Sequence, residues 1–259
     1  MTAPLLRVDD LRIRFGAREA VGGVSFEMGR ERLGIVGDSG SGKSLTARSL
    51  LRLLPPGAAM KAARLTFDGI DLLELSQTGM RALRGRRLGL VLQDPRFSLN
   101  PAMPVGQQIA EAWLAHQRLS RRAVREKTLR MLDAVHIREP ERVSALYPHE
   151  LSGGMGQRVM IAMMLAPDPD LLIADEPTSA LDATLRLQVL AILDEQVERR
   201  GMGLILISHD LDLVGCFCDR VLVMQSGRIV ESLDAGALSA ARHPYTRRLL
   251  ASRPRLGMP

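Results

Sequence analysis

The amino-acid sequence predicts an α/β protein with a largely parallel sheet covered by helices on both faces. Short apolar runs of strand length alternate with segments of helical periodicity along the 259 residues. A glycine-rich segment at residues 37–44 stands between one such run and a helical segment. Hydrophobic residues make up 46% and charged residues 25% of the chain, which is typical of a globular protein with a sizeable core.

The first elements expected are three strands, at residues 11–15, 24–28 and 32–36, separated by turns that contain glycine. The first two alternate apolar with polar residues, which indicates half-buried strands, whereas the third is more continuously apolar. A helix is expected over residues 45–54, because the Pro-Pro-Gly sequence that follows would stop it.

The later elements alternate between strands and helices. Strands are expected at residues 65–67, 88–92, 171–174, 204–207 and 221–224. The pattern from about residue 95 to about residue 165 is largely helical, and we interpret it as an inserted helical subdomain (about 95–165). Within a single domain of 1–259, a core with its β subdomain then covers about 1–94 and 166–240, and a C-terminal tail covers about 241–259.

The composition of the chain indicates where in the cell the protein is expected and whether it is expected to bind nucleic acid. No apolar run approaches the roughly 18–20 residues that span a bilayer, and the N-terminus has no apolar stretch of signal-peptide length. We therefore expect the protein to stay in the cytoplasm unless a partner holds it at a membrane. The net charge of +6 would suit nucleic acid, but the basic residues are dispersed and only 3% of residues are aromatic. An arginine-rich solvated surface is therefore favoured.

Cys216 and Cys218 are the two cysteines of the chain. A Cys-x-Cys pair can bind a metal or undergo redox chemistry, but no further cysteine completes a thiolate site. Cysteines that pack near the end of a helix are the favoured interpretation.

Residues 37–44 match the phosphate-binding pattern G-x-x-x-x-G-K-[ST], with the required strand before it and helix after it. Backbone N–H groups of this loop are expected to surround the β-phosphate of a nucleotide. Lys43 would reach the β- and γ-phosphates, and the Ser44 hydroxyl would bind Mg²⁺. The residues expected to contact the nucleotide here are Gly37, Asp38, Ser39, Gly40, Ser41, Gly42, Lys43, Ser44 and Leu45.

Asp175 and Glu176 follow the apolar strand at residues 171–174. An aspartate in this place can hold Mg²⁺, commonly through water, because Mg²⁺ keeps several of its waters. Glu176 is expected to point the opposite way on an extended backbone, where it could orient or deprotonate an attacking water. Two solvated acids at a strand end are the alternative interpretation, and the phosphate loop in the same chain argues against it.

A second glycine segment, Ser152-Gly153-Gly154, precedes residues of helical periodicity. The serine hydroxyl, together with backbone N–H groups that no Cβ shields, would form an anion-binding helix start. The chain would then have two phosphate-binding helix starts, one more than a single simple nucleotide site needs.

Together these segments resemble the ATP-binding-cassette (ABC) ATPases. Residues 37–44 match the family's Walker A motif, 172–175 its Walker B motif, 151–155 its signature motif, Gln93 its Q-loop, 179–182 its D-loop and His209 its switch histidine. Phe15 stands where the family carries an aromatic residue that stacks on adenine. The resemblance covers essentially the whole chain. It implies a P-loop NTPase (RecA-like) core with an antiparallel β subdomain and an inserted helical subdomain.

The resemblance also implies a mechanism that uses ATP and Mg²⁺. Two copies would enclose two ATP molecules, each between one phosphate loop and the other copy's Ser-Gly-Gly segment, with Asp182 at the seam. His209 would hold the γ-phosphate and the attacking water. Gln93 would contact Mg²⁺ and link the site to the helical insertion, whose surface would receive a membrane partner. The residues expected to be catalytic are Glu176, His209, Lys43 and Gln93, and those expected to hold the metal are Ser44, Gln93 and Asp175.

Residues 93–101, 153–162 and 243–250 look like the importers of oligopeptides, dipeptides and nickel. Peptide importers often continue past the last segment into a cysteine-bearing tail, whereas this sequence stops at Pro259 and has no such cysteines. That departure favours the shorter nickel or metallophore importers, and peptide importers remain the other open alternative. Gly156 departs from the branch, which often has a larger residue there. Because glycine costs about 1 kcal/mol relative to alanine inside a helix, a looser first turn is expected.

The partners implied by the resemblance are two membrane permeases, a second ABC ATPase and, indirectly, a solute-binding protein. A heterodimer of two ATPases is favoured over a homodimer, at the cytoplasmic face of the cell (inner) membrane, and no nucleic acid is expected. A soluble ABC protein of DNA repair or translation is the alternative, although such proteins typically carry long coiled-coil insertions or two cassettes. A non-hydrolysing scaffold is a third class, which Glu176 and His209 argue against.

Overall fold

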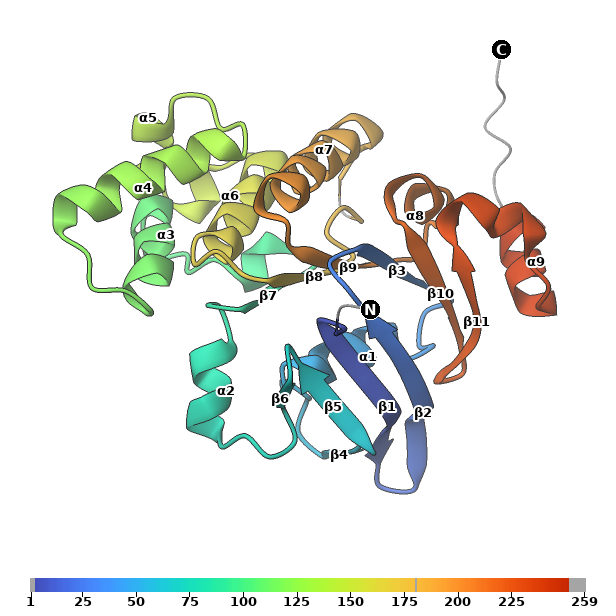
Figure 1. The fold of residues 1–259 in the computed structure, drawn as a ribbon. Helices are drawn as coiled ribbons and strands as arrows, with labels where there is room; N and C mark the ends of the chain where they lie inside the picture. The colour runs from blue at the N-terminus through green and yellow to red at the C-terminus, as the bar shows by residue number, and fades with distance from the viewer. Residues whose placement is uncertain (1–2, 180, 252–259) are drawn as a thin grey trace, which may run out of the picture. The chain divides into compact units, whose positions relative to one another are not determined.

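The computed structural model describes residues 3–179 and 181–251 (Figure 1). Ala180 of the predicted D-loop and the part of the predicted tail beyond residue 251 lie outside the described residues. The chain divides into two compact units: the first contains residues 1–75 and 205–259, and the second contains residues 76–204. The predicted helical subdomain at about residues 95–165 lies inside the second unit, and its boundaries stay a prediction.

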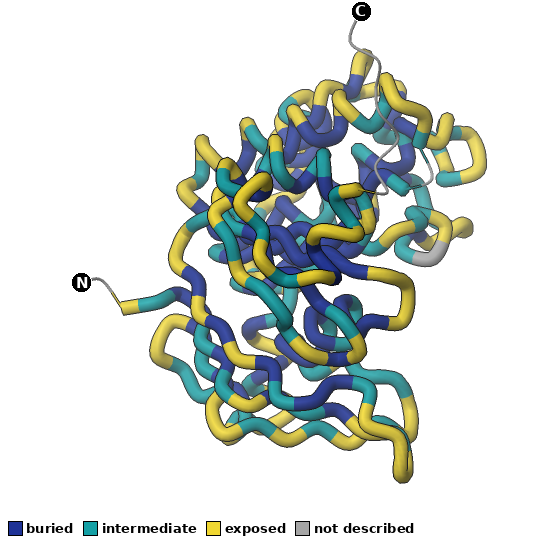
Figure 2. Tube along the Cα trace, turned by 90° about the vertical axis from the view of Figure 1, so that its right-hand side faces the viewer, coloured by how far each residue is buried: buried dark blue, intermediate teal, exposed yellow. Residues whose placement is uncertain are grey.

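An antiparallel sheet forms a large part of the first unit. Its strands are β1 (Leu6–Phe15), β2 (Arg18–Met28), β4 (Ala58–Lys61), β5 (Arg64–Phe67) and β6 (Ile70–Asp71). The central strand β1 pairs with β2, β4 and β5. Along β1, Leu6, Val8, Leu11 and Ile13 are fully buried and the side chains between them are more exposed. The three-residue step from Val8 to Leu11 coincides with a register shift against β2. Figure 2 shows the alternation of burial along these strands.

The first unit also contains parallel strands. β10 (Arg220–Gln225) runs parallel to β3 (Arg32–Val36) and antiparallel to the edge strand β11 (Arg228–Asp234). β9 (Gly203–Ser208) lies on the other side of β3 and is buried throughout. Continuous burial of this kind is expected for parallel strands covered on both faces. The helices of this unit are α1 (Lys43–Leu50), α8 (Leu211–Phe217), η3 (Ala235–Ala240) and α9 (Pro244–Ala251).

The second unit is mainly helical around one parallel strand pair. β7 (Leu88–Val91) runs parallel to β8 (Leu171–Asp175). The helices are α2 (Gln77–Leu83), η1 (Pro95–Phe97), α3 (Val105–Leu114), α4 (Arg121–Ala134), α5 (Pro140–Ser144), η2 (Pro148–Glu150), α6 (Gly153–Leu165) and α7 (Ala183–Arg200). The stretch of α6 at residues 159–162 is fully buried, as expected for a helix that is apolar all round. α6 is therefore the central helix of the unit, and its N-terminal end carries the predicted signature motif.

The structure confirms the expected strands and differs at the end of α1 and at three further strands. Helix α1 ends at Leu50 rather than at residue 54, because Arg52 adopts a left-handed conformation (φ 52°) and the Leu53 N–H returns to the Arg48 carbonyl at 3.0 Å. The strands β4, β6 and β11 were not expected. β11 contains both charged and apolar side chains on an edge position, so its apolar signal in the sequence is weak.

A helix that spans a bilayer must be both long enough and apolar enough. Across residues 3–179 and 181–251, no helix meets both requirements.

Candidate functional site

The predicted site residues fall into two groups, one in each unit. The phosphate loop, Phe15 and His209 belong to the first unit. Gln93, the acidic pair at residues 175–176, the Ser-Gly-Gly segment and Asp182 belong to the second.

The phosphate loop is held against the turn between β10 and β11. Gly37 is buried with a φ of 151°, and a Cβ there would clash with the carbonyl oxygen of Met224 in β10. From the turn, the Gly227 N–H donates to the Ser41 carbonyl oxygen at 2.9 Å. Because only glycine fits the approach to Met224, packing against β10 already requires the glycine at position 37.

Lys43 lies inside the curve of this loop. It is 6% exposed, and its Nζ donates to the carbonyl oxygens of Gly37 at 2.7 Å and Asp38 at 2.9 Å. These bonds aim a positive charge at the place where the pattern expects the β- and γ-phosphates. Ser44 and Leu45 follow in the first turn of α1, where backbone N–H groups and the helix dipole favour an anion.

The remaining residues of the phosphate loop differ in their exposure to solvent. Asp38, Ser39 and Gly40 are exposed, whereas Ser41 and Gly42 are buried. The Asp38 N–H does not face the inside of the loop, because it donates to the hydroxyl of Tyr245 in α9 at 2.8 Å. Tyr245 was not among the predicted site residues, because its partner is a backbone group about 200 residues earlier and leaves no local pattern.

His209 and Phe15 lie at the ends of strands of the first unit. His209 is exposed and directly follows β9. Its position is set by the next residue, because the Asp210 carboxylate caps α8 by accepting from the Asp212 and Leu213 N–H groups, at 3.1 Å and 3.0 Å. Phe15 ends β1 and is only half-buried, so part of its ring is accessible.

The acidic pair of the second unit lies where β8 ends. Asp175 is the last residue of the strand and is 5% exposed. The prediction that Glu176 continues on an extended backbone is wrong, because Glu176 adopts a left-handed conformation with φ 49°. Its carbonyl accepts from the Ser179 hydroxyl at 3.1 Å, which closes a tight turn. A left-handed glutamate costs on the order of 1–3 kcal/mol, a strain typical of functional positions.

The Ser-Gly-Gly segment begins α6 as predicted. Ser152 is the N-cap residue, and its hydroxyl accepts from the Met155 N–H at 3.4 Å. Gly153 is exposed, and a Cβ there would meet nothing within 4 Å. The first residue of α6 is an exposed glycine, so no side chain covers the first N–H groups of the helix. Because α6 has more than three turns, its N-terminus can bind an anion.

Leu185 of α7 brings the signature and D-loop motifs together. Asp182 caps α7 by accepting from the Leu185 N–H at 2.9 Å. The Leu185 side chain lies over Gly154, where a Cβ would be 3.0 Å from it. Gly154 therefore allows close packing of α7 on α6, and a Cβ there would require the Leu185 side chain to shift by a few tenths of an ångström.

A hollow of about 490 Å³ lies beside the Q-loop segment of the second unit. Gln93 is exposed two residues after β7, and the hollow begins at the next residue, Asp94. Its lining contains Pro95, Leu99 and Pro101 from this segment. Further lining residues come from η2, from the N-cap region of α6 and from its first turns: Pro148, His149, Leu151, Ser152, Gly153, Gly156 and Gln157. One surface depression thus contacts both the segment after Gln93 and the Ser-Gly-Gly segment.

The Q-loop segment is fixed by a residue that sequence analysis missed. The buried side chain of Gln108 in α3 accepts from the Asn100 N–H at 2.9 Å and donates to the carbonyl oxygens of Asn100 and Met103, at 2.9 Å and 2.7 Å. Glutamine in a helix carries no signal of such a role, because both partners are backbone groups.

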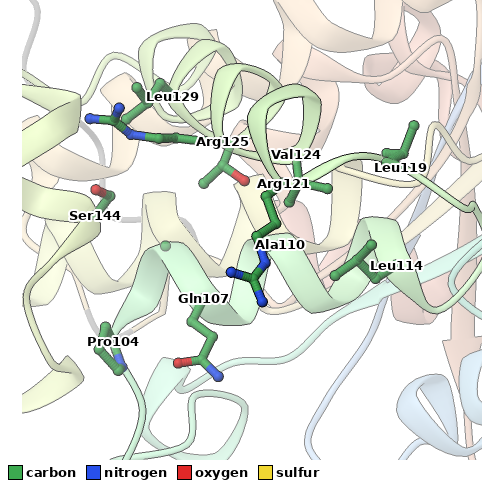
Figure 3. A pocket seen from close by; sticks show the side chains of 12 residues that line it. Pro104, Gln107, Ala110, Leu114, Leu119, Arg121, Val124, Arg125, Leu129 and Ser144 are labelled. Atoms are coloured by element: carbon green, nitrogen blue, oxygen red, sulfur yellow. The ribbon is translucent and has the colours of Figure 1, made fainter.

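A second hollow, of about 400 Å³, lies between α3 and α4 and is lined by none of the predicted site residues. Figure 3 shows its side chains, with Ala110 and Leu114 on α3 and Val124 and Leu129 on α4. Leu114 is 49% exposed at its edge. This hollow is mainly apolar, and it shares no lining residue with the hollow beside Gln93.

Gly156 lies in the first turn of α6 and opens the hollow beside Gln93. Its N–H donates to the Ser152 carbonyl at 2.9 Å, so the expected loosening of this turn is not observed. A Cβ at this position would be 3.5 Å from Pro95, which is ordinary contact distance. A larger side chain would therefore extend into the hollow.

The side chains expected to hold Mg²⁺ offer hard oxygen donors. The Ser44 hydroxyl and the Asp175 carboxylate suit this ion, which prefers oxygen ligands and retains waters. Among the residues that the structure describes, no group of three or more His, Cys, Asp or Glu side chains is placed to hold another metal. Cys216 is exposed and Cys218 buried, and burial raises the pKa of the Cys218 thiol to about 12.

Comparisons with known proteins agree with these motifs. A family model described as "ABC transporter" matches residues 21–179. A probable peptide ABC transporter ATP-binding protein of Sinorhizobium fredii is 50% identical over 96% of this chain and 77% of its own length. An oligopeptide transport ATP-binding protein of Bacillus subtilis is 44% identical over 97% of this chain and 72% of its own length. A glutathione import ATP-binding protein of Pectobacterium atrosepticum is 49% identical over 92% of this chain, which spans 40% of that longer protein.

Two solved structures are similar over most of the chain. The dimeric, post-hydrolysis ATP-binding cassette MJ0796, bound to ADP and Pi, has a TM-score of 0.78 at 25% identity and covers 89% of this chain and 98% of its own. cbiO1 of Clostridium perfringens, part of an ABC transporter complex, has a TM-score of 0.79 at 27% identity and covers 98% of each chain. The matched family region includes the phosphate loop, Gln93, the Ser-Gly-Gly segment and the acidic pair.

Proposed function

The chain belongs to the ABC transporter family and is an ATPase coupled to transport, and from this premise we propose that it powers the import of peptides through membrane permeases. The observation that carries the proposal is the pair of glycine-containing helix starts. One, before α1, holds a buried lysine, and the other, before α6, is exposed. An ATPase that acts alone would need only the first.

We propose the following roles for the residues of this chain. Lys43 binds the β- and γ-phosphates, and Phe15 stacks on the adenine. Glu176 accepts the proton of the attacking water, and His209 holds this water and the γ-phosphate by hydrogen bonds. Ser44, Asp175 and Gln93 would hold Mg²⁺. When bound, this ion neutralises charge on the phosphates.

The exposed Ser-Gly-Gly segment is proposed to serve the ATP of a partner subunit. A related cassette was solved as a dimer, which supports this arrangement. The branch that the chain resembles often pairs two different ATPases, and on that ground we propose a heterodimer. ATP would then hold the two subunits together, and its hydrolysis would release them.

Peptide is the proposed cargo. The relatives from Sinorhizobium fredii and Bacillus subtilis are named for peptide transport, and the relative from Pectobacterium atrosepticum for glutathione, which is a tripeptide. None of these names refers to nickel, so nickel or metallophore transport has support only from the resemblance of the branch. A role in DNA repair or translation has no supporting observation.

Purification from membranes tests this function. We expect two permeases and a second ABC ATPase to co-purify with the chain, and a peptide-loaded binding protein to stimulate ATP hydrolysis by the complex. A nickel-loaded binding protein should leave the rate at its basal level. Recovery with ribosomal or DNA-repair proteins in place of permeases would favour the soluble alternative.

We propose that a permease docks in the hollow beside Gln93. An occupant of this hollow would contact the segment after Gln93 and the start of α6 together, so its movement could reach both nucleotide-handling segments. The apolar lining by Pro95, Leu99 and Pro101, at a site rimmed by charged Asp94 and Arg96, suits an amphipathic segment of a partner.

Two matched arginine substitutions distinguish the two hollows. Pro101→Arg places a long charged side chain at the exposed edge of the hollow beside Gln93, and Leu114→Arg does the same at the hollow between α3 and α4. We expect Pro101→Arg to reduce permease recovery at least about tenfold, a loss of about 1.4 kcal/mol, and to leave the Kd of the isolated chain for ATP within about twofold. Leu114→Arg should recover permease as the wild type does. The reverse pattern would place the permease between α3 and α4.

A further inference from the structure

The His-Pro-Tyr-Thr sequence at residues 243–246 indicates a branch of importers but has no role in the chemistry proposed above. The structure places it at the start of α9, in contact with the phosphate loop. We propose that Tyr245 is a positioning residue, which holds the phosphate loop from outside and thereby sets the place of the Lys43 ammonium. The inference rests on the ATP-binding role of the loop.

The contact fixes one peptide plane from both sides. The Asp38 N–H donates to the Tyr245 hydroxyl at 2.8 Å, and the Gly37 carbonyl oxygen accepts from Lys43 Nζ at 2.7 Å. This N–H and this carbonyl belong to the same peptide unit, and in a trans peptide they point in opposite directions. The plane therefore cannot rotate without breaking a bond to Tyr245 outside the loop or to Lys43 inside it.

Tyr245 is itself held firmly. It is 5% exposed, and its N–H donates to His243 Nδ1 at 3.3 Å, which satisfies one of the first amide groups of α9. The Glu231 carboxylate of β11 accepts from the backbone N–H groups of Arg242 and His243, at 2.7 Å and 3.2 Å. The next residue, Thr246, is fully buried. These contacts anchor the start of α9, so they fix the position of the Tyr245 hydroxyl that accepts from the loop.

Burial is the main reason that the hydroxyl stays neutral. It raises the pKa of Tyr245, and the Asp38 side chain raises this pKa too, whereas the Asp38 N–H and the charge of Arg248 oppose the shift. Burial also raises the pKa of Glu231, but the Thr246 side chain, the N–H groups of Arg242 and His243 that donate to its carboxylate, and the charge of His243 together outweigh burial and lower this pKa. Glu231 thus stays ionised as the anchor of α9, and Tyr245 stays a phenol that accepts from the loop.

This assignment removes one amide from the set expected to bind phosphate. The Asp38 N–H is committed to Tyr245, so the anion-binding amides of the loop lie after it. The commitment pre-organises the loop, because the orientation of the Gly37 carbonyl oxygen, a partner of Lys43, is set before ATP arrives.

The test is Tyr245→Phe in the full chain, which removes the hydroxyl and keeps the buried ring. Arg247→Ala is the matched control, since Arg247 is exposed on the same helix. We expect the Kd for ATP to rise about three- to tenfold in Tyr245→Phe, as for the loss of one neutral hydrogen bond. In the assembled transporter, KM for ATP should rise by the same factor while kcat changes less than about twofold. Hydrogen–deuterium exchange of the Asp38 amide should become faster, and the control should match the wild type in every measurement.

An unchanged Kd together with unchanged exchange would overturn the assignment. So would a fall in kcat at constant KM, which would indicate a general loss of folded protein. A wild-type chain that bound no ATP would contradict the proposed function instead. The exchange measurement needs no nucleotide, so it tests the contact with Tyr245 in that case too.

Discussion

Glu176→Gln is expected to bind ATP normally and to lose nearly all turnover. The glutamine amide has the shape of the carboxylate but cannot accept the proton of the attacking water, and a general base typically contributes 10²- to 10⁴-fold. We therefore expect the ATPase rate of the assembled protein to fall roughly 10³-fold. Because ATP is proposed to hold two subunits together, the variant should accumulate as an ATP-bound dimer.

The measurements are the ATPase rate and the mass by light scattering with and without ATP. Glu195→Gln is the matched control, since Glu195 is exposed and its carboxylate contacts His136 at 3.1 Å on the surface of the second unit. The control should keep wild-type turnover. Normal turnover of Glu176→Gln would remove Glu176 from its proposed role, and its left-handed backbone would then need another explanation.

Ser152→Arg is expected to abolish hydrolysis without weakening ATP binding to the isolated chain. The arginine side chain would cover the exposed start of α6, where Gly153 now leaves open space. If this helix start serves the ATP of the partner, the phosphate loop of the same chain is untouched. We expect the Kd for ATP of the monomer to stay within about twofold and turnover to fall at least about 10²-fold, as for the loss of a phosphate-binding donor.

The substitution also removes a helix cap, which costs about 0.5–2 kcal/mol of stability. Ser120→Arg controls for this loss, because Ser120 caps α4 in the same way and its hydroxyl accepts from the Ala123 N–H at 3.3 Å. The control variant should hydrolyse ATP at the wild-type rate. A monomer of Ser152→Arg that no longer bound ATP would contradict the assignment of this segment to a partner's nucleotide.

The phosphate loop and the Ser-Gly-Gly segment were predictable because their chemistry is local. A glycine-rich turn between a strand and a helix predicts an anion-binding site without reference to any distant residue. The fold class was predictable for a similar reason, since strands such as β8 and β9 are continuous apolar runs bounded by turns. Strand β11 was missed because its charged residues lie on an edge, where burial imposes no pattern.

The residues that hold the site in place were not predictable. Tyr245 bonds to a backbone group of a remote loop and Gln108 to backbone groups of the preceding loop, and a backbone partner leaves no trace in the identity of the residue it belongs to. Leu185 has an ordinary place in a helix, yet its side chain packs so closely on position 154 that a Cβ there would be 3.0 Å from it. The backbone of Glu176 was predicted wrongly, because the turn that bends it is closed by Ser179, three residues later.

Residue types at short spacing were enough to predict the chemistry that we propose: a lysine and amides for phosphate, an acidic pair for metal and water, and a second glycine-containing helix start. The fold was needed to find which of these groups already have partners within the protein. The Asp38 amide faces α9 and Gly154 is covered by α7, because burial obliges backbone amides to find partners and glycines to admit neighbours wherever the fold brings them.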